Sequence, residues 1–165
     1  MDIEIRRIPG IALENENSGK LIYTPPEGEQ LIQHLMANWE QFIHNHTDIE
    51  PLVRMAISHY RFEAIHPFID GNGRTGRILN LLFLIEQGLL DSPVLYLSRY
   101  IVQNKSDYYR YLQEVTNEDA WDQWVLYILD AVEKTSIWTR EKLFIHPKLM
   151  TLLSLDENDF ENYRQ

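Results

Sequence analysis

The chain has 165 residues, of which 44% are hydrophobic and 12% aromatic, and it contains no cysteine. This length and composition predict a single globular domain with a buried core, and they exclude disulfides, thiol catalysis and thiolate metal sites. Fifteen basic residues against 25 acidic ones leave a net charge of −10, which argues against a nonspecific nucleic-acid partner but not against a small basic nucleotide pocket. No apolar run approaches the ~20 residues of a membrane span and no apolar signal core opens the chain, so we expect a cytoplasmic protein without a membrane partner.

The N-terminal part predicts a small β-hairpin over residues 10–24, because two short apolar stretches flank a polar, turn-rich connection. A helix is then expected to start at Thr24, with two prolines in its first turn and Glu27 at the reciprocal capping position. The apolar residues that follow have helical spacing. They are Leu31, Ile32, Leu35, Met36, Trp39, Phe42 and Ile43.

The rest of the chain is predicted to be helical. Pro51 opens a second helix. The helix over residues 74–87 is apolar nearly all round, a pattern that predicts a place at the centre of a bundle. Residues 98–116 predict one broken or two short helices, and the tryptophans after them open a long amphipathic one. We therefore expect a mainly α domain over residues 1–145, followed by a polar, frayed tail over 146–165.

Chemistry-bearing side chains are concentrated in residues 66–77, which read HPFIDGNGRTGR. Arg74 and Arg77 share a face in the first turns of a helix, where the macrodipole disfavours cations by ~0.3–1 kcal/mol each. A bound anion reverses this effect, because backbone amides and both guanidinium groups then converge on it. Gly71 and Gly73 let the chain curl its amides inward. The segment therefore predicts a phosphate site beside a histidine.

Three familiar motifs nearly fit this segment. Residues 71–76 spell GxGxxG, but a dinucleotide site needs a preceding strand, and the preceding residues have a helical period. A P-loop would need Lys and Ser/Thr where Arg77 and Ile78 stand, and an EF-hand loop from Asp70 lacks its glycine and its final glutamate. Taken one by one, the residues also have ordinary explanations, such as a loop histidine and helix N-caps.

The twelve residues match the signature of the Fic family, HxFx(D/E)GNGRxxR, at every fixed position. The chain resembles the catalytic core of bacterial Fic proteins from the predicted hairpin to about Trp138. This resemblance implies a Fic-type helical bundle in which the hairpin is a flap. It also implies a protein adenylyltransferase, which transfers AMP from ATP to a Ser, Thr or Tyr hydroxyl of a target protein.

The resemblance assigns roles to individual residues. His66 would be the general base and Asp70 would bind Mg²⁺. The amides of residues 71–73 and the Asn72 side chain would hold the α- and β-phosphates, and Arg77 would meet the γ-phosphate. The full nucleotide-binding set is Gly71, Asn72, Gly73, Arg74, Thr75, Gly76 and Arg77, with Tyr108 and Asn117 facing the adenine. The flap residues that would pair with the target's backbone are Leu21, Ile22, Tyr23 and Thr24.

Many Fic proteins carry an inhibitory helix with the motif (S/T)xxxE(G/N), whose glutamate pairs with the second arginine of the signature. Here glutamate precedes Gly or Asn at five positions, and none has Ser or Thr four residues earlier. We therefore expect that no inhibitory glutamate of this sequence pairs with Arg77, and that any inhibition comes from a separate protein. Packing helices missing from such a core would leave apolar surface that favours a homodimer.

Two alternatives stay open at this point. A catalytically silent or truncated Fic core would act as a nucleotide-binding or interaction module. An active Fic enzyme could also transfer another phosphate-containing group, because the signature does not decide between donors.

Overall fold

A computed structural model gives the arrangement of the chain and describes residues 5–7, 13–14, 21–91 and 94–144. These residues are mainly helical, which confirms the predicted fold class. The helices are α1 (Glu29–Asn45), α2 (Pro51–Ile65), α3 (Asn72–Glu86), α4 (Leu97–Gln103), α5 (Lys105–Glu118) and α6 (Trp121–Phe144). Among the described residues, no helix is both long enough and apolar enough to cross a membrane.

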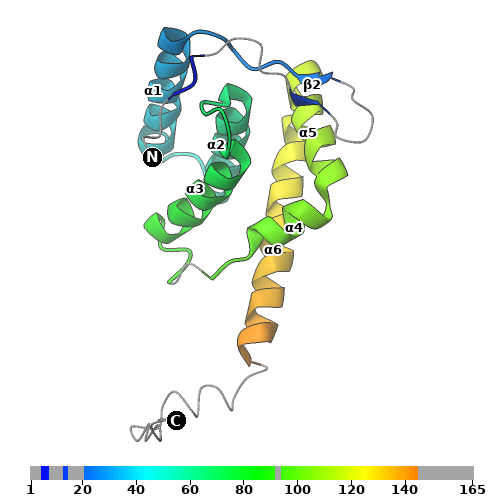
Figure 1. The fold of residues 1–165 in the computed structure, drawn as a ribbon. Helices are drawn as coiled ribbons and strands as arrows, with labels where there is room; N and C mark the ends of the chain where they lie inside the picture. Colours follow the sequence, from blue (N-terminus) through cyan, green and yellow to red (C-terminus); the bar gives the residue numbers. More distant parts are fainter. Residues whose placement is uncertain (1–4, 8–12, 15–20, 92–93, 145–165) are drawn as a thin grey trace, which may run out of the picture.

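Two short strands, β1 (Leu13–Glu14) and β2 (Leu21–Tyr23), pair antiparallel within the predicted hairpin. Leu13 lies opposite Tyr23, and β2 packs against α5 (Figure 1). The other residues of the predicted hairpin, 10–12 and 15–20, lie outside the described residues. The role of this segment as a flap therefore stays a prediction, and the predicted tail over 146–165 also lies outside the described residues.

The predicted start of the first helix at Thr24 is wrong. Helix α1 begins at Glu29, its N-cap is Gly28 at φ 100°, and no side chain caps it. Thr24 and Pro25 each precede a proline, which biases both residues toward extended backbone. Pro26 is held by another contact, because its carbonyl accepts a hydrogen bond from the guanidinium of the buried Arg6.

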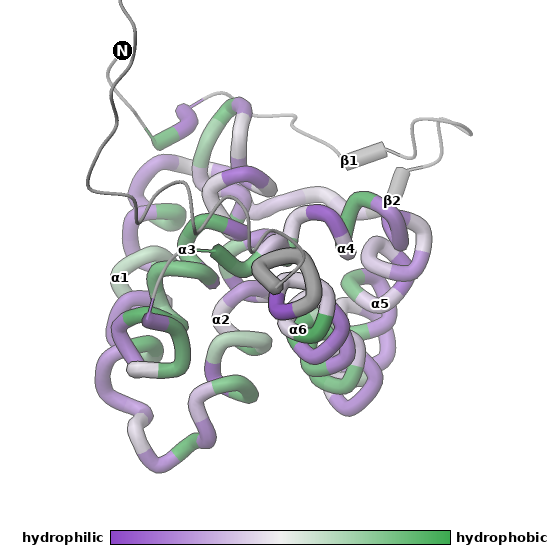
Figure 2. The backbone as a smooth tube through the Cα atoms, turned by 90° about the horizontal axis from the view of Figure 1, so that it is seen from below, coloured by the Kyte–Doolittle hydropathy of each residue, from purple (hydrophilic) through white to green (hydrophobic). Residues whose placement is uncertain are grey.

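Helix α2, and not α3, occupies the centre of the bundle. It packs against α1, α3 and α6 (Figure 1), and in the view from below it lies between α1 and α6 (Figure 2). Although residues 78–85 of α3 are apolar at every position but Asn80, Ile78 is 57% exposed and Leu82 is 54% exposed. The prediction from apolar pattern failed because α2 buries polar side chains, including Arg54, His59 and Glu63, that make it look like a surface helix.

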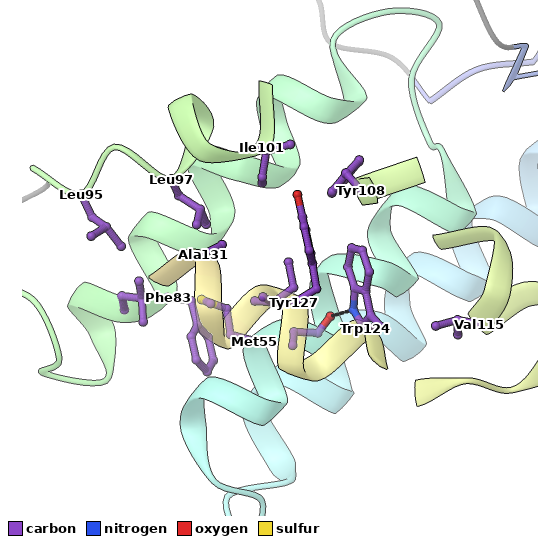
Figure 3. Close-up of a cluster of buried hydrophobic side chains, with 13 residues drawn as sticks. Met55, Phe83, Leu95, Leu97, Ile101, Tyr108, Val115, Trp124, Tyr127 and Ala131 are labelled. Atoms are coloured by element: carbon purple, nitrogen blue, oxygen red, sulfur yellow. Dashed lines mark hydrogen bonds between the residues drawn. The ribbon is translucent and has the colours of Figure 1, made fainter. Parts of the chain in front are cut away.

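The main core lies where α2 meets α6 and α5. Trp124 is fully buried, and its indole N–H donates to the carbonyl oxygen of Ala56 at 2.8 Å (Figure 3). Tyr108 and Tyr127 pack around this tryptophan from α5 and α6. Helix α2 starts at Pro51 as predicted, and the Glu50 carboxylate accepts a hydrogen bond from the Leu52 amide. The core thereby holds α2 through Met55 and Ala56, and the signature segment begins where this helix ends.

Candidate functional site

The signature begins where α2 ends, at His66. This residue adopts the left-handed conformation, with φ 51° and ψ 59°, and its amide donates to the carbonyl of Phe62 at 3.0 Å. Arg6 holds the turn from the other side: its Nε donates to the His66 carbonyl at 2.6 Å, and its amide donates to the Pro67 carbonyl at 2.9 Å. The buried Arg6 was missed in the sequence, since nothing in its local pattern marks it as structural.

Asn72 closes the loop between α2 and α3. Its side-chain Oδ1 accepts from the Phe68 amide at 2.8 Å, and its Nδ2 donates to the Phe68 carbonyl at 2.7 Å. The residue is only 2% exposed. Both polar atoms of this side chain hold the loop, and its predicted contact with phosphates stays a prediction. The Phe68 ring packs on Phe62 of α2, with the ring centroids 6.2 Å apart.

The N-terminus of α3 has the features of an anion site. Gly71 is the N-cap at φ 85°, no side chain caps the helix, and no acidic residue lies in its first turn. The first intrahelical bond is made by the Thr75 amide to the Gly71 carbonyl, so the amides of residues 72–74 point out of the helix end. Arg74 and Arg77 add positive charge to the same turns. An anion placed here would meet both amides and guanidinium groups.

Most of the predicted site residues line one cleft of about 370 Å³ between the signature segment and helices α4 and α5. The predicted residues among its walls are His66, Asp70, Gly71, Asn72, Gly73, Arg74, Arg77 and Tyr108. Lys105 also lies in the wall and adds a cation. The cleft thus unites a histidine, a carboxylate, three cations and a helix N-terminus.

Three predicted nucleotide-binding residues do not line this cleft. Thr75 is half-buried in α3, Asn117 is exposed near the end of α5, and Gly76 is buried against α2. A Cβ atom on Gly76 would lie 2.6 Å from Glu63 Oε1 and 3.2 Å from the His59 ring. Gly76 is therefore a position of close helix packing.

A second, smaller cavity of about 100 Å³ adjoins the cleft, and the two share His66, Gly73, Arg77, Tyr108 and Tyr109. Its wall also includes Tyr23, which β2 brings over the end of α2. Of the other predicted flap residues, Thr24 is exposed, whereas the side chains of Leu21 and Ile22 lie outside the described part of the structure.

Tyr108 is more deeply buried than a base-contacting residue requires. It is 3% exposed, and its hydroxyl lies 3.0 Å from His59 Nε2. Burial raises the pKa of Tyr108 well above its usual value and lowers the pKa of His59 to about 3, so both groups are neutral at pH 7. Tyr108 can present its ring to the cleft while its hydroxyl stays in the core.

His66 has the properties of a neutral base. Burial lowers its pKa below the ordinary histidine value, and its Nδ1 lies 3.4 Å from the Glu63 carbonyl. When Nδ1 carries the proton and donates to that carbonyl, Nε2 is the nitrogen with the free lone pair. The half-buried ring can then accept a proton from a group in the cleft.

Asp70 and Arg74 form an ion pair at the mouth of the cleft. Asp70 Oδ2 accepts from Arg74 Nη2 at 2.9 Å, and both side chains are more than two-thirds exposed. Arg77 Nε donates to Ser98 Oγ of α4 at 3.1 Å. Because exposed ion pairs contribute little, Arg74 can turn toward an anion at small cost.

The one carboxylate that lines the cleft, Asp70, fits a magnesium ion that arrives with a nucleotide. Within the described residues, no group of three or more His, Asp or Glu side chains could hold a metal ion by itself. Mg²⁺ in nucleotide enzymes commonly needs only one or two carboxylates, since phosphate oxygens and waters complete its shell. The exposed carboxylate of Asp70, beside the α3 N-terminus, meets that requirement.

Comparison with known proteins agrees with this geometry. The sequence model of the Fic/DOC family matches residues 3–84, which include the whole signature. This chain belongs to the Fic/DOC family. A crystal structure of a Fic family protein from Desulfovibrio desulfuricans superposes with a TM-score of 0.70 at 31% identity, over 87% of this chain and 42% of that one.

Curated Fic relatives are named protein adenylyltransferase Fic. The protein from Drosophila virilis is 31% identical over 139 residues, which cover 81% of this chain and 27% of the relative. The protein from Drosophila grimshawi is 34% identical over 112 residues, which cover 67% of this chain and 22% of the relative. The chain therefore spans about a quarter of the length of these Fic proteins.

Proposed function

We propose that this Fic domain is a protein adenylyltransferase that transfers AMP from ATP to a hydroxyl side chain of a target protein. The observation that carries the proposal is the cleft itself, in which a neutral histidine faces an anion-binding helix N-terminus. The name shared by the curated Fic relatives supports the same activity.

In this reaction the target's hydroxyl oxygen attacks the α-phosphorus of ATP, and the bond from that phosphorus to the β-phosphate bridging oxygen breaks. Pyrophosphate leaves with the bond electrons. His66 Nε2 takes the proton of the hydroxyl, and its lowered pKa keeps the imidazole neutral and able to accept at pH 7.

The α3 N-terminus would hold the phosphates through the amides of residues 72–74 and the guanidinium groups of Arg74 and Arg77. Asp70 would hold Mg²⁺, which neutralises phosphate charge when bound. Arg74 pairs with one oxygen of Asp70, Oδ2, and would leave this oxygen to meet the phosphate. With the nucleotide bound, Asp70 would bind the metal ion and Arg74 would bind the phosphate.

The wall of the cleft opposite the α3 N-terminus would bind the adenine base and the target protein. The ring of Tyr108 would border the nucleoside, and β2 would present its edge to the target's backbone. A cytoplasmic location, a separate inhibitor protein and a homodimer remain part of the proposal. The exposed Ile78 and Leu82 on α3 are an apolar surface of the kind that such partners cover.

The test compares ATP labelled at the α-phosphate with ATP labelled at the γ-phosphate, each with Mg²⁺ and a lysate of candidate targets. Adenylyl transfer predicts protein-bound label from the α-labelled nucleotide only. Protein-bound label from the γ-labelled nucleotide would indicate phosphoryl transfer. Mg²⁺-dependent ATP binding without either label would favour the silent nucleotide-binding module.

A further inference from the structure

A buried carboxylate lies directly behind the predicted phosphate site. Glu63, one turn before His66 on α2, is 8% exposed. Among the described residues, its Oε1 atom has no hydrogen-bond partner. An unpaired buried carboxylate is costly, so its presence calls for a physical explanation.

The position of Glu63 relative to α3 links it to Arg77. A Cβ atom built on Gly73 would lie 3.9 Å from Glu63 Oε1 and 3.2 Å from Arg77 Nη1. The carboxylate and the guanidinium thus approach the same point at the start of α3. Both residues also line the cavity of about 100 Å³ that adjoins the cleft.

The charge of Glu63 matters for an anion bound in this place. An ionised carboxylate behind the α3 N-terminus offsets the positive potential of Arg77 and of the helix dipole. A polyphosphate at the same helix end would be repelled by that carboxylate, and it would compete for the same guanidinium. The repulsion disappears if the carboxyl group is protonated.

We propose that Glu63 is an internal counter-charge for Arg77, which takes up one proton from solvent when a nucleotide's phosphates bind at the α3 N-terminus. This inference rests on the proposed nucleotide site and adds a regulation to it. Glu63 acts through Arg77 and touches no reacting atom, so it is a positioning residue. The affinity for ATP then falls as the pH rises.

The starting state of Glu63 suits such a change. Burial raises the pKa of Glu63 from 4.5 to about 7, against the lowering effect of Arg77. A bound polyphosphate removes part of the stabilisation that Arg77 gives to the carboxylate and adds negative charge nearby. Both effects raise the pKa further, so that the carboxyl group is protonated in the loaded state at neutral pH.

Other titratable groups surround Glu63 and must be separated from it. His59 lies one turn earlier on α2, and its pKa of about 3 keeps it neutral across the neutral pH range. The remaining groups around the cavity are Tyr23, Tyr60, His66, Arg77, Tyr108 and Tyr109. Among them is His66, whose pKa is lowered by burial, and its protonation at lower pH would also favour anion binding. A His66→Ala background removes this contribution and also prevents turnover.

The experiment measures binding of ATP with Mg²⁺ by titration calorimetry between pH 6 and pH 8.5, with His66→Ala and with His66→Ala/Glu63→Gln. Each titration is run in two buffers of different ionisation enthalpy, which reports protons taken up. With Glu63 present, we expect uptake approaching one proton above pH 7, and an affinity that falls up to about tenfold between pH 6 and pH 8. In the Glu63→Gln protein the affinity at pH 8 is higher, and the proton uptake is absent.

The outcomes separate this inference from the proposed function. ATP binding with the same pH dependence and the same proton uptake in both proteins would refute the role of Glu63 and leave the nucleotide site intact. Absence of ATP binding in both proteins at every pH, with folding verified by circular dichroism, would refute the nucleotide site and the inference together. If the Glu63→Gln variant does not fold, proton uptake by the His66→Ala protein alone decides, and no uptake at pH 7.5 refutes the inference.

Discussion

Asn72→Ala is expected to destabilise the domain, because the Asn72 side chain holds the loop that carries the signature. The substitution removes two hydrogen bonds, at 2.8 and 2.7 Å, and leaves both the amide and the carbonyl of Phe68 without that partner. Each unmatched group in a buried setting costs about 1–3 kcal/mol. Because water can enter beside the partly buried Phe68, we expect the free energy of unfolding to fall by about 2–4 kcal/mol in total.

The assay is denaturant unfolding followed by tryptophan fluorescence, since the chain has four tryptophans. Asn38→Ala is a matched control, because Asn38 accepts an exposed hydrogen bond from Arg61, and we expect its loss to change the free energy of unfolding by less than about 0.5 kcal/mol. If the Asn72 side chain instead contacted phosphates, Asn72→Ala would weaken ATP binding and leave the unfolding free energy unchanged. That result would refute the structural role.

Three further predictions concern the contacts behind the cleft. Gly76→Ala should lower stability by about 1–3 kcal/mol despite the better helix propensity of alanine, because the new Cβ would lie 2.6 Å from the buried Glu63 Oε1; an unchanged or higher melting temperature would contradict this packing. Tyr108→Phe should lower the free energy of unfolding by about 1–3 kcal/mol, because it leaves His59 Nε2 without its hydrogen-bond partner. The control Tyr96→Phe, at a residue 61% exposed, should leave the free energy of unfolding almost unchanged. Equal effects of the two substitutions would argue against the buried hydrogen bond. The pKa of Glu63, raised to about 7, means that the folded state binds more protons than the unfolded state between pH 4.5 and 7. Wild type should therefore lose up to about 3 kcal/mol of stability relative to Glu63→Gln as the pH rises through this window, and a pH-independent difference would show that the carboxylate is not buried.

Much of the site was predictable because its residues are contiguous. The loop, the helix N-terminus and both arginines of the signature lie within residues 66–77, so local geometry alone brings them together. The prolines and glycines there also marked the break between α2 and α3. The histidine and the carboxylate followed from the same short segment.

What the sequence did not reveal depends on contacts between distant residues. Arg6 clamps His66 across 60 positions, and such a contact leaves no local pattern. Glu63 and His59 look like the polar face of an ordinary helix, yet they are buried where α2 meets α3 and α5. For the same reason the centre of the bundle was wrongly assigned to α3, whose apolar Ile78 and Leu82 are exposed.

The distinction between a phosphate contact and a structural contact also needs the fold. Asn72 stands in the middle of the signature, but its side chain forms hydrogen bonds with the backbone of Phe68. Gly76 fits a phosphate-loop pattern, but its missing side chain makes room for Glu63. Sequence spacing places such residues near the site and cannot say which way they face.

The most direct test of the account is transfer of label from α-labelled ATP with Mg²⁺, comparing wild type with His66→Ala. We expect labelled protein with wild type and a loss of label by about 10²–10⁴-fold in the variant, while ATP still binds, because the histidine accepts the proton and does not hold the phosphates. Equal labelling by both proteins would contradict His66 as the base. Absence of label from wild type, in a lysate that a known Fic adenylyltransferase labels, would contradict the proposed activity in that setting.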